Sequence, residues 1–321
     1  MQTLVIINNA AAKARRAWPI IRKQLHLAGF DYQSYETKAA GDATLRTRQA
    51  LRDGITRIAV VGGDGTLSEA VEGFFEINSD LDELPRSINP EAQLAILPAG
   101  TGDDFARGLR GGRASLRSWI ETLVSPAESG MIKVDVLYGR CDGFQKPFIC
   151  LNASTMGIGG ETAQRVSAQS DFLRRFPGEF RFVLAAVGAL AVWRERRVRV
   201  TVDGRVVGDS QMNLIGVANG LYAGGGMKLS PTARLDDGKL DVVTASGLSR
   251  RNVVTELSRV HTGGHVTNPK VNITQGQIVC VETFLEQDAM PIEADGNFRG
   301  VTPVQFRVIP EALNFVVGPG Q

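Results

Sequence analysis

The order of hydrophobic and polar positions divides the chain into two parts. In the first part, short apolar runs rich in β-branched residues alternate with longer stretches whose apolar positions recur at helical spacing. Strands that alternate with helices of this length predict an α/β domain, with a parallel sheet and helices on both faces. The predicted strands are residues 4–7, 32–35, 55–61 and 94–97, and the predicted helices are residues 13–27, 42–52, 66–77 and 116–124.

The second part begins after residues 125–130, a Pro- and Gly-bearing segment that we interpret as a hinge. Its apolar positions recur every second residue, which predicts strands, and Asp203-Gly204 between two of these runs predicts a hairpin turn. We therefore expect a β-rich, mainly antiparallel domain folded as a sandwich or part-barrel. The predicted strands are residues 132–138, 148–152, 197–202, 205–207, 212–218, 240–245, 271–273, 278–283 and 304–308.

The apolar run at residues 58–61 ends in the glycine-rich loop Gly62-Gly63-Asp64-Gly65, and a predicted helix follows. Glycines leave no Cβ between backbone amides and a ligand, and a helix presents its positive end there, so the loop favours phosphate. A carboxylate repels phosphate unless it holds Mg²⁺ or accepts a proton from a reacting group, which are the two chemical roles open to Asp64. A sharp turn with Asp64 and Thr66 as helix caps explains the same residues.

Other polar residues follow neighbouring strands of the predicted sheet. Asn8 follows the strand at 4–7, Thr37 follows the strand at 32–35, and Thr101 lies in a second glycine-bearing turn after the strand at 94–97. Ligands of parallel sheets bind at the carboxyl ends of the strands. We therefore expect these side chains and the glycine-rich loop to converge on one crevice.

Composition narrows the function classes. The net charge of +2 is too small to indicate a nucleic-acid partner, and the three cysteines lack the spacing of a disulfide framework or a zinc site. The pair His261 and His265 is separated by two glycines, which favours a turn with solvated histidines. There is no signal-peptide pattern, so we expect a cytoplasmic protein.

One segment raises the question of membrane contact. Residues 172–193 combine a helical pattern and an apolar run with arginines on both sides, as expected of a helix at an anionic bilayer surface. A helix packed on the β-rich domain with solvated arginines explains the pattern at least as well, and we favour it. The apolar run, residues 182–193, is shorter than the roughly 20 residues that a spanning helix needs.

Four motifs in order along the chain resemble the diacylglycerol kinase catalytic family, which includes soluble bacterial lipid kinases and is related to sphingosine and ceramide kinases. The resemblance covers nearly the whole chain. It implies transfer of the γ-phosphoryl group of ATP to a lipid hydroxyl, a nucleotide domain of the NAD-kinase and diacylglycerol-kinase type, and a β-sandwich lipid domain. The motifs are Gly62-Gly63-Asp64-Gly65-Thr66, residues 97–107, residues 235–241, and Glu293-Ala294-Asp295-Gly296 with the following tail to Pro303.

The resemblance also implies domain limits and site residues. Residues 1–128 would bind ATP, residues 129–311 would bind the lipid, and the strand near 312–318 would return to the first domain. A structural Mg²⁺ would bind the Asp237 carboxylate and the backbone carbonyls of Arg234 and Lys239, although a plain reverse turn also explains this segment. ATP contacts would fall on Asn8, Thr37, Gly62, Gly63, Asp64, Gly65, Thr66, Leu67, Ser68 and Thr101.

Three positions depart from the family pattern. The first loop reads Asn8-Asn9-Ala10-Ala11-Ala12 instead of Asn-Pro-x-Ser-Gly, and Asp103 stands where an asparagine is usual. The tail has Asn297 in place of the glutamate usually assigned as proton acceptor, and an amide cannot accept a proton at neutral pH. Asp64 or Asp295 is the replacement that we favour; phosphate positioning with Mg²⁺ alone, or loss of activity, are the alternatives.

The sequence leaves two other functions open: an NAD or small-metabolite kinase with the same loop, and a nucleotide- or lipid-binding protein that has lost its catalysis. Transient contact with a membrane surface, at the inner face, follows from a lipid substrate. The sequence does not identify the lipid or the oligomeric state.

Overall fold

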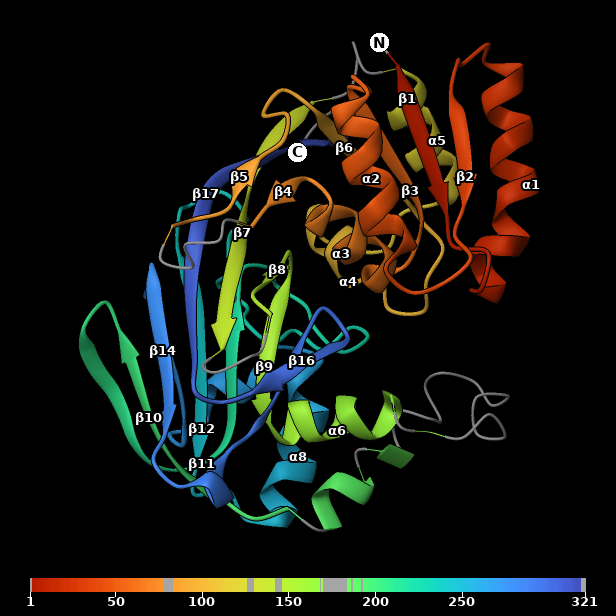
Figure 1. Ribbon diagram of the computed structural model, residues 1–321. Helices are drawn as coiled ribbons and strands as arrows, with labels where there is room; N and C mark the ends of the chain where they lie inside the picture. Colours follow the sequence, from red (N-terminus) through yellow and green to blue (C-terminus); the bar gives the residue numbers. More distant parts are fainter. Residues whose placement is uncertain are drawn as a thin grey trace. The chain divides into compact units, whose positions relative to one another are not determined.

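The computed structural model describes residues 2–77, 83–125, 130–141, 146–167, 169, 184–185, 187–191 and 193–318. These residues form two compact units (Figure 1). Unit 1 consists of residues 1–136, 235–237 and 309–321, and unit 2 consists of residues 137–234 and 238–308. The chain passes between the units within strand β7 (Met131–Cys141), within strand β17 (Val304–Val316) and on either side of residues 235–237.

Unit 1 is built on a parallel sheet, as predicted. Its strands are β1 (Thr3–Ile7), β2 (Gln33–Glu36), β3 (Arg57–Gly62) and β6 (Gln93–Pro98), in the order β2-β1-β3-β6. The end of β17 adds to the free edge of β6, with Asn314 opposite Gln93. Strands β1 and β3 are buried along their whole length, because helices cover both faces of the sheet.

The helices of unit 1 are α1 (Ala12–Leu27), α2 (Asp42–Arg52), α3 (Asp64–Glu72), α4 (Asp104–Leu109) and α5 (Leu116–Val124). The prediction of a helix at 66–77 is wrong at its C-terminal end, because α3 ends before Gly73. The chain then enters β4 (Phe75–Glu76), which pairs with β5 (Arg86–Ser87). A Cβ at Gly73 would lie 2.6 Å from the carbonyl oxygen of Thr44 in α2. This close approach between α2 and α3 is therefore possible only with glycine, a constraint that helical periodicity does not reveal.

Unit 2 is β-rich and mainly antiparallel, which confirms the predicted fold class. Its strands follow the order β16-β15-β9-β11-β10-β14-β17, and β12 pairs with both β11 and β13. Their inward side chains form one hydrophobic core that includes Val200, Ile215, Val243 and Phe306. The bounds are β8 (Phe148–Cys150), β9 (Ala153–Gly157), β10 (Arg196–Val202), β11 (Arg205–Ala218), β12 (Leu240–Ser246), β13 (Val271–Gly276), β14 (Ile278–Thr283), β15 (Pro291–Ala294) and β16 (Asn297–Val301).

Several details of unit 2 differ from the predictions. The hairpin at Asp203-Gly204 is confirmed, because Val202 pairs with Arg205, but the two runs at 205–207 and 212–218 belong to one strand, β11. Helix α6 (Ile158–Ser167) and strands β9, β15 and β16 were not predicted. Helix α8 spans Arg250–Val260. The short η2 (Gly264–Thr267) and η3 (Glu286–Asp288) complete the unit.

The histidine prediction is wrong in part. The segment at His261 is a turn, but His265 is buried and its Nε2 lies 3.0 Å from the carbonyl oxygen of Leu229. Burial also lowers the pKa of His265, because it disfavours the charged ring.

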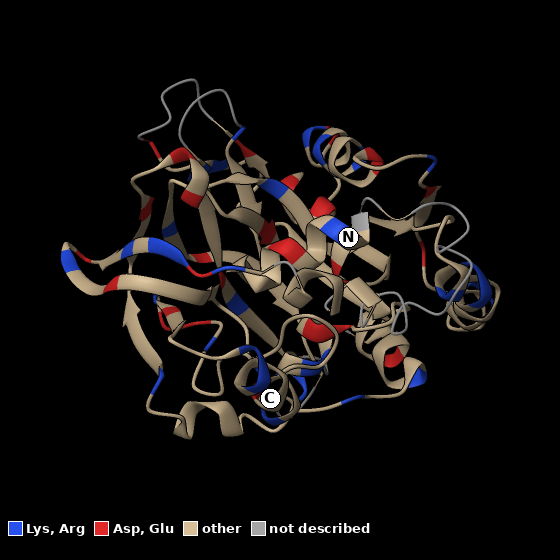
Figure 2. Ribbon diagram, turned by 90° about the horizontal axis from the view of Figure 1, so that it is seen from below, with Lys and Arg blue, Asp and Glu red and all other residues tan. Residues whose placement is uncertain are grey.

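Most of the predicted helix at 172–193 lies outside the described residues, which are helical at 184–185 and 187–191. The arginines that follow it pair with acidic residues, and Figure 2 shows Lys and Arg residues interspersed with Asp and Glu residues along the ribbon. Arg197 and Arg199 both contact Asp209, and Arg196 contacts Glu161. In the part of the chain that the structure describes, no helix combines the length and the apolar character needed to cross a bilayer.

Candidate active site

The carboxyl ends of the unit 1 strands meet at one edge of the sheet. In the parallel register, Ile7 of β1 lies opposite both Glu36 of β2 and Val61 of β3, and Gly62 lies opposite Pro98 of β6. The residues that follow these strands therefore lie side by side along this edge. The structure thus brings together Asn8, Thr37, Gly62 to Ser68 and Thr101, all within unit 1.

Asn8 connects the loop after β1 to the start of α3. Its Nδ2 donates a hydrogen bond to Oγ1 of Thr66 at 2.7 Å, and its Oδ1 accepts from the backbone amides of Ala10 and Ala11 at 3.1 Å each. These bonds fix the loop. Thr37 is held at the neighbouring strand end, because its backbone amide donates to the carbonyl of Ile7 at 2.9 Å.

Two glycines let the two glycine-bearing turns pack backbone against backbone. A Cβ on Gly63 would lie 2.9 Å from Cα of Gly100, and a Cβ on Gly100 would lie 2.5 Å from Cα of Gly63. Real Cβ atoms do not come this close to backbone atoms. The glycines thus permit the approach of two strand-to-helix turns that form one surface at the sheet edge.

The first turn of α3 carries the features expected of an anion site. Its N-cap is Gly63, which offers no side-chain cap, and a Cβ on Gly65 would meet nothing within 4 Å. A helix start that no side chain caps is a place where a phosphate could accept hydrogen bonds from backbone amides. Leu67 and Ser68 are each 1% exposed, so their contact with a nucleotide stays a prediction.

Asp64 has a defined partner in the second turn. Its carboxylate accepts hydrogen bonds from the backbone amides of Asp104 and Phe105, both at 3.0 Å. Asp64 thereby caps the first turn of α4, although it lies in a different loop. The sequence interpretation of Asp64 as a helix cap is thus observed, but for α4 and not for the helix that Asp64 itself begins. Its role in catalysis stays a prediction.

The acidic residue Asp103 lies beside Asp64. Burial, and then the negative charge of Asp64, raise the pKa of Asp103 to about 6. The residue adopts a left-handed backbone conformation with φ of 50°, and its Oδ1 accepts from the amide of Gly100 at 2.9 Å. Asp103 is thus held in place as part of the second turn while carrying an unfavourable charge above pH 6.

Two cations near this turn were missed by the sequence analysis. Nζ of Lys13 donates to the carbonyl of Gly100 at 3.1 Å, and a guanidinium nitrogen of Arg113 lies 3.4 Å from the carbonyl oxygen of Thr101. Both positive charges lower the pKa of Asp103, but burial raises it by more. Lys13 could have been found from its position directly after the first loop, whereas the approach of Arg113 depends on the fold.

The turn proposed to hold Mg²⁺ contains residues of both units. Asp237 is half-buried at the end of the 235–237 segment of unit 1, while Arg234 and Lys239 belong to unit 2. One carboxylate and two carbonyls are suitable ligands for Mg²⁺, and Gly238 at φ +66° permits the sharp turn that would present them. Among the described residues there is no cluster of three or more His, Cys, Asp or Glu side chains able to hold a metal.

The tail motif forms a tight hairpin in unit 2. Asp295 and Gly296 have φ of 47° and 83° and connect β15 to β16, with Ala294 opposite Asn297. The carboxylate of Asp295 is buried and accepts from the backbone amides of Leu151, Asn152 and Ala153 at 2.7, 3.0 and 3.3 Å. These bonds anchor the hairpin to residues 151–153 and give Asp295 a structural role, while its catalytic role stays a prediction.

A second carboxylate of this hairpin, Glu293, was not singled out from the sequence. Its Oε2 accepts from Oγ1 of Thr155 at 2.7 Å, and its Oε1 accepts from the backbone amide of Gly296. Burial raises the pKa of Glu293 to about 7, and the charge of Asp295 adds to this effect. The signal in the sequence was only its place two residues before the Asp-Gly turn.

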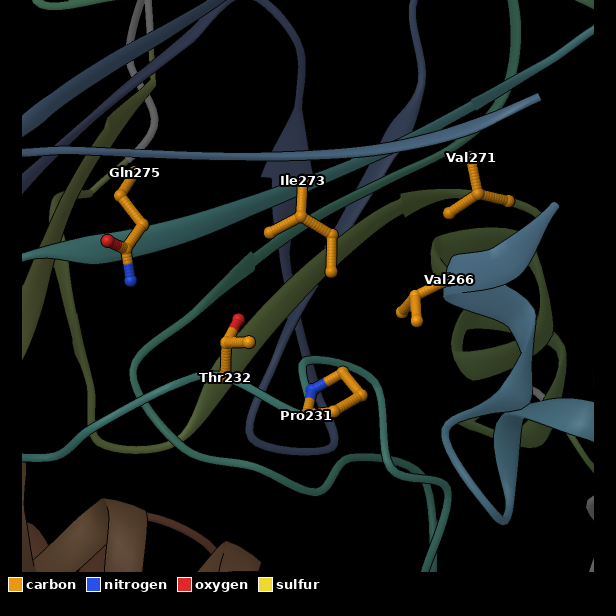
Figure 3. A pocket seen from close by; sticks show the side chains of 6 residues that line it. All are labelled: Pro231, Thr232, Val266, Val271, Ile273 and Gln275. Atoms are coloured by element: carbon orange, nitrogen blue, oxygen red, sulfur yellow. The ribbon is translucent and has the colours of Figure 1, made fainter. Parts of the chain in front are cut away.

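Unit 2 also has an open hollow of about 500 Å³ between β13, η2 and the loop at 231–232 (Figure 3). Thr232 and Gln275 donate to the carboxylate of Asp241 at 2.8 and 2.7 Å. No charged side chain lines the hollow, which therefore does not suit a triphosphate. Its lining consists of Pro231, Thr232, Val266, Val271, Ile273 and Gln275, and none of the predicted site residues is among them.

Comparisons with known proteins agree with this organisation. Residues 2–136 match the diacylglycerol kinase catalytic domain, and residues 156–317 match the YegS C-terminal NAD kinase beta sandwich-like domain. The diacylglycerol kinase of Staphylococcus carnosus (strain TM300) is 28% identical over 305 residues, which are 94% of this chain and 90% of that protein. The diacylglycerol kinase of Staphylococcus aureus (strain JH9) is 28% identical over 308 residues, 94% of this chain and 88% of that protein.

A similar fold is present in a crystal structure of a diacylglycerol kinase from Bacillus anthracis str. Sterne, with a TM-score of 0.69 and 22% identity over 99% of this chain and 97% of that one. The matched domains cover both parts of the chain in the predicted order. The chain therefore belongs to the diacylglycerol kinase family, with a diacylglycerol kinase catalytic domain followed by a YegS-type β-sandwich domain.

Proposed function

We propose that the protein is an ATP-dependent lipid kinase that transfers the γ-phosphoryl group of ATP to the hydroxyl of a lipid such as diacylglycerol. The observation that carries the proposal is the edge of the unit 1 sheet, where an uncapped helix start and two glycine turns meet. The relatives named diacylglycerol kinase support the acceptor class. Ceramide and sphingoid bases carry the same kind of hydroxyl.

In this proposal, unit 1 binds ATP. The phosphates lie against the backbone from Gly62 to Gly65, where α3 begins, and Asn8 fixes the loop beside them. Lys13 and Arg113 supply positive charge near the second turn, which offsets the carboxylates of Asp64 and Asp103. Phosphoryl transfer needs mainly orientation and charge neutralisation, and these residues provide both.

A divalent cation belongs to the proposal in two ways. Mg²⁺ bound with ATP neutralises phosphate charge, and a second, structural Mg²⁺ would be held by Asp237 with the carbonyls of Arg234 and Lys239. In the same proposal, residues 129–311 hold the lipid, and residues 1–128 with the strand near 312–318 hold ATP.

We also propose that unit 2 meets the membrane surface from which the lipid comes. Phe284 and Leu285 follow β14 and are 54% and 55% exposed, and the guanidinium of Arg199 lies 4.9 Å from the ring centroid of Phe284. Exposed aromatic and aliphatic side chains suit the interface of a bilayer, and Arg199, although it is paired with Asp209, lies beside them. Cosedimentation with phosphatidylglycerol vesicles should weaken in Phe284→Ser/Leu285→Ser and remain in the control Val206→Ser, which removes another exposed apolar side chain of unit 2.

The test of the proposed function is incubation of the protein with labelled ATP, Mg²⁺ and separate lipids, followed by chromatography of the products. We expect a labelled phospholipid with one lipid class. Label on NAD, with none on any lipid, would assign the protein to NAD kinases instead. Binding of ATP without any labelled product would show a protein that has lost its catalysis.

A further inference from the structure

The hollow in unit 2 has a polar end and an apolar end (Figure 3). Val271, Ile273 and Gln275 line it from β13, where alternate residues share one face of the strand. Gln275 and Thr232 lie at one end, and Val271 and Val266 lie at the other. The volume of about 500 Å³ falls within the range of about 300–1,000 Å³ that is typical of small-molecule sites. All the lining residues belong to unit 2, so the hollow is complete without unit 1.

A buried carboxylate stands behind the polar end. Asp241 is 2% exposed, and its Oδ1 accepts a hydrogen bond from Nε2 of Gln275 at 2.7 Å. Its Oδ2 accepts from the hydroxyls of Ser230 and Thr232, the latter at 2.8 Å. These partners are neutral, and within the described ranges no Lys, Arg or His side chain forms an ion pair with Asp241. A charge buried among neutral groups is screened weakly, so the polar end of the hollow, one side chain away, favours a cation.

The same hydrogen bonds determine what the polar end can offer a ligand. Thr232 uses its only hydroxyl hydrogen on Asp241, so toward a ligand its Oγ1 can only accept. Gln275 uses one amide hydrogen in the same way and keeps its side-chain oxygen as an acceptor. The stem of Lys228 lies near the Pro231 ring, but the Lys228 side chain does not line the hollow. A head group that donates hydrogen bonds and carries positive charge therefore fits this end, and an anionic head group does not.

We propose that the hollow binds a primary amine that carries an aliphatic chain. The ammonium group donates to Oγ1 of Thr232 and to the side-chain oxygen of Gln275, with the charge of Asp241 behind them. The chain lies along Ile273 toward the two valines at the apolar end. Soluble alkylamines and membrane lipids of the sphingoid-base type share this chemistry. The site does not rest on the proposed kinase function, because no residue of unit 1 takes part in it.

The first test titrates the protein with octylammonium, 1-octanol and octanoate, which share one chain length and differ in the charge of the head group. Methyl NMR of labelled Ile and Val residues reports where each compound binds. We expect octylammonium to shift the signals of Ile273 and Val266 and to leave that of Val206, an exposed valine on β11, in place. The affinity for octylammonium should exceed that for octanol by about tenfold, the difference between a charge-assisted and a neutral hydrogen bond, and octanoate should not bind.

Two results of this titration would overturn the proposal. One is an Ile273 signal that does not respond to octylammonium. The other is octanol binding as tightly as octylammonium, because the charge of Asp241 would then have no effect on the ligand.

The second test changes the polar end itself. Thr232→Val keeps the shape of the side chain and removes the hydroxyl, and Thr274→Val, on the opposite face of β13 from Gln275, is the matched control. We expect the affinity for octylammonium to fall by about fivefold or more in Thr232→Val and to stay within about twofold of the parent in Thr274→Val. An equal loss in both variants would contradict the assignment. Asp241→Asn should bring octylammonium and octanol to similar affinities; if this variant does not fold, Thr232→Val and the comparison of head groups still decide.

Vesicles distinguish the two sources of the amine. Phosphatidylcholine vesicles with and without sphingosine are sedimented with the parent and with Thr232→Val. Sphingosine-dependent cosedimentation of the parent that is weaker for Thr232→Val would identify a membrane lipid as the ligand. Its absence, with octylammonium bound in the hollow, would identify a soluble amine. A hollow that binds neither compound refutes the site and leaves the kinase function standing.

Discussion

Gly63 and Gly100 approach so closely that a Cβ on Gly100 would lie 2.5 Å from Cα of Gly63. The two turns that follow β3 and β6 are thereby packed against each other, and each begins a helix at the same edge of the sheet. Substitution of the glycines should separate two effects, stability and phosphate binding.

Gly100→Ala should lower the free energy of unfolding by about 1–3 kcal/mol, because the added methyl group must displace backbone. Gly65→Ala is the matched variant, since its Cβ meets nothing within 4 Å and its position is helical. We expect Gly65→Ala to keep its melting temperature while its affinity for ATP falls, because the methyl group would occupy open space in the first turn of α3, where we propose that the phosphates lie. Calorimetric unfolding and ATP titration measure the two quantities. Unchanged ATP affinity in Gly65→Ala would place the phosphates elsewhere.

Asp103→Asn should stabilise the protein above about pH 6. The folded-state pKa of Asp103 is raised from 3.8 to about 6, so its ionisation destabilises the folded state progressively between these values. Asparagine keeps an acceptor for the amide of Gly100 and tolerates the left-handed backbone. We expect a gain on the order of 1–2 kcal/mol in urea unfolding at pH 7.5 and little gain at pH 4. An equal effect at both pH values would show that the charge is not the cause.

Asp64→Asn should lose both stability and turnover. Asn retains one oxygen and replaces the other with an amide group that cannot accept from the backbone, so either Asp104 or Phe105 loses its partner. Loss of a helix cap is worth about 1 kcal/mol. Thermal unfolding and lipid phosphorylation measured on the same sample give both effects. A loss of stability with full turnover would limit Asp64 to the cap.

Much of unit 1 follows from its sequence, because parallel strands and amphipathic helices have strong periodic signals. The convergence of Asn8, Thr37 and the glycine-rich loop also follows, since strand ends of a parallel sheet meet at one edge. The structural role of Asp295 did not follow, because its partners are backbone amides 142–144 residues away. Periodicity describes which face a residue occupies and cannot reveal such distant partners.

The missed elements of unit 2 have a similar explanation. Residues 153–167 contain glycines and polar residues that break both periods, yet they form β9 and α6, because Gly157 and Gly160 approach backbone of β11 and β15. A Cβ on Gly160 would lie 2.0 Å from the carbonyl oxygen of Pro291. Glu293 was overlooked for a related reason, since its contact with Thr155 depends on the pairing of β15 with β9.

Asp237→Ala tests the proposed structural Mg²⁺. The carboxylate is the only side-chain ligand in the proposed set, so its loss should remove most of the affinity of this turn for the ion. We expect Mg²⁺ to raise the melting temperature of the parent and to have a smaller effect on Asp237→Ala, because an ion that binds only the folded state stabilises it. Asp236→Ala, a neighbouring exposed carboxylate, is the control. Equal stabilisation of the parent and Asp237→Ala by Mg²⁺ would refute the site.

Asn297→Glu decides between a site that lacks a base and a site in which another carboxylate, Asp64 or Asp295, serves. Asn297 lies opposite Ala294 in the hairpin, beside the Asp-Gly turn that Glu293 also contacts. If the site had no base, the new carboxylate should raise the rate by about 10²-fold or more. If another carboxylate serves, a second negative charge nearby disfavours the charged form of that carboxylate and repels the phosphates, so the rate should stay flat or fall. We expect the second outcome. Rates of lipid phosphorylation at pH 7 for the parent and Asn297→Glu check this prediction. A large gain in rate on substitution would contradict it.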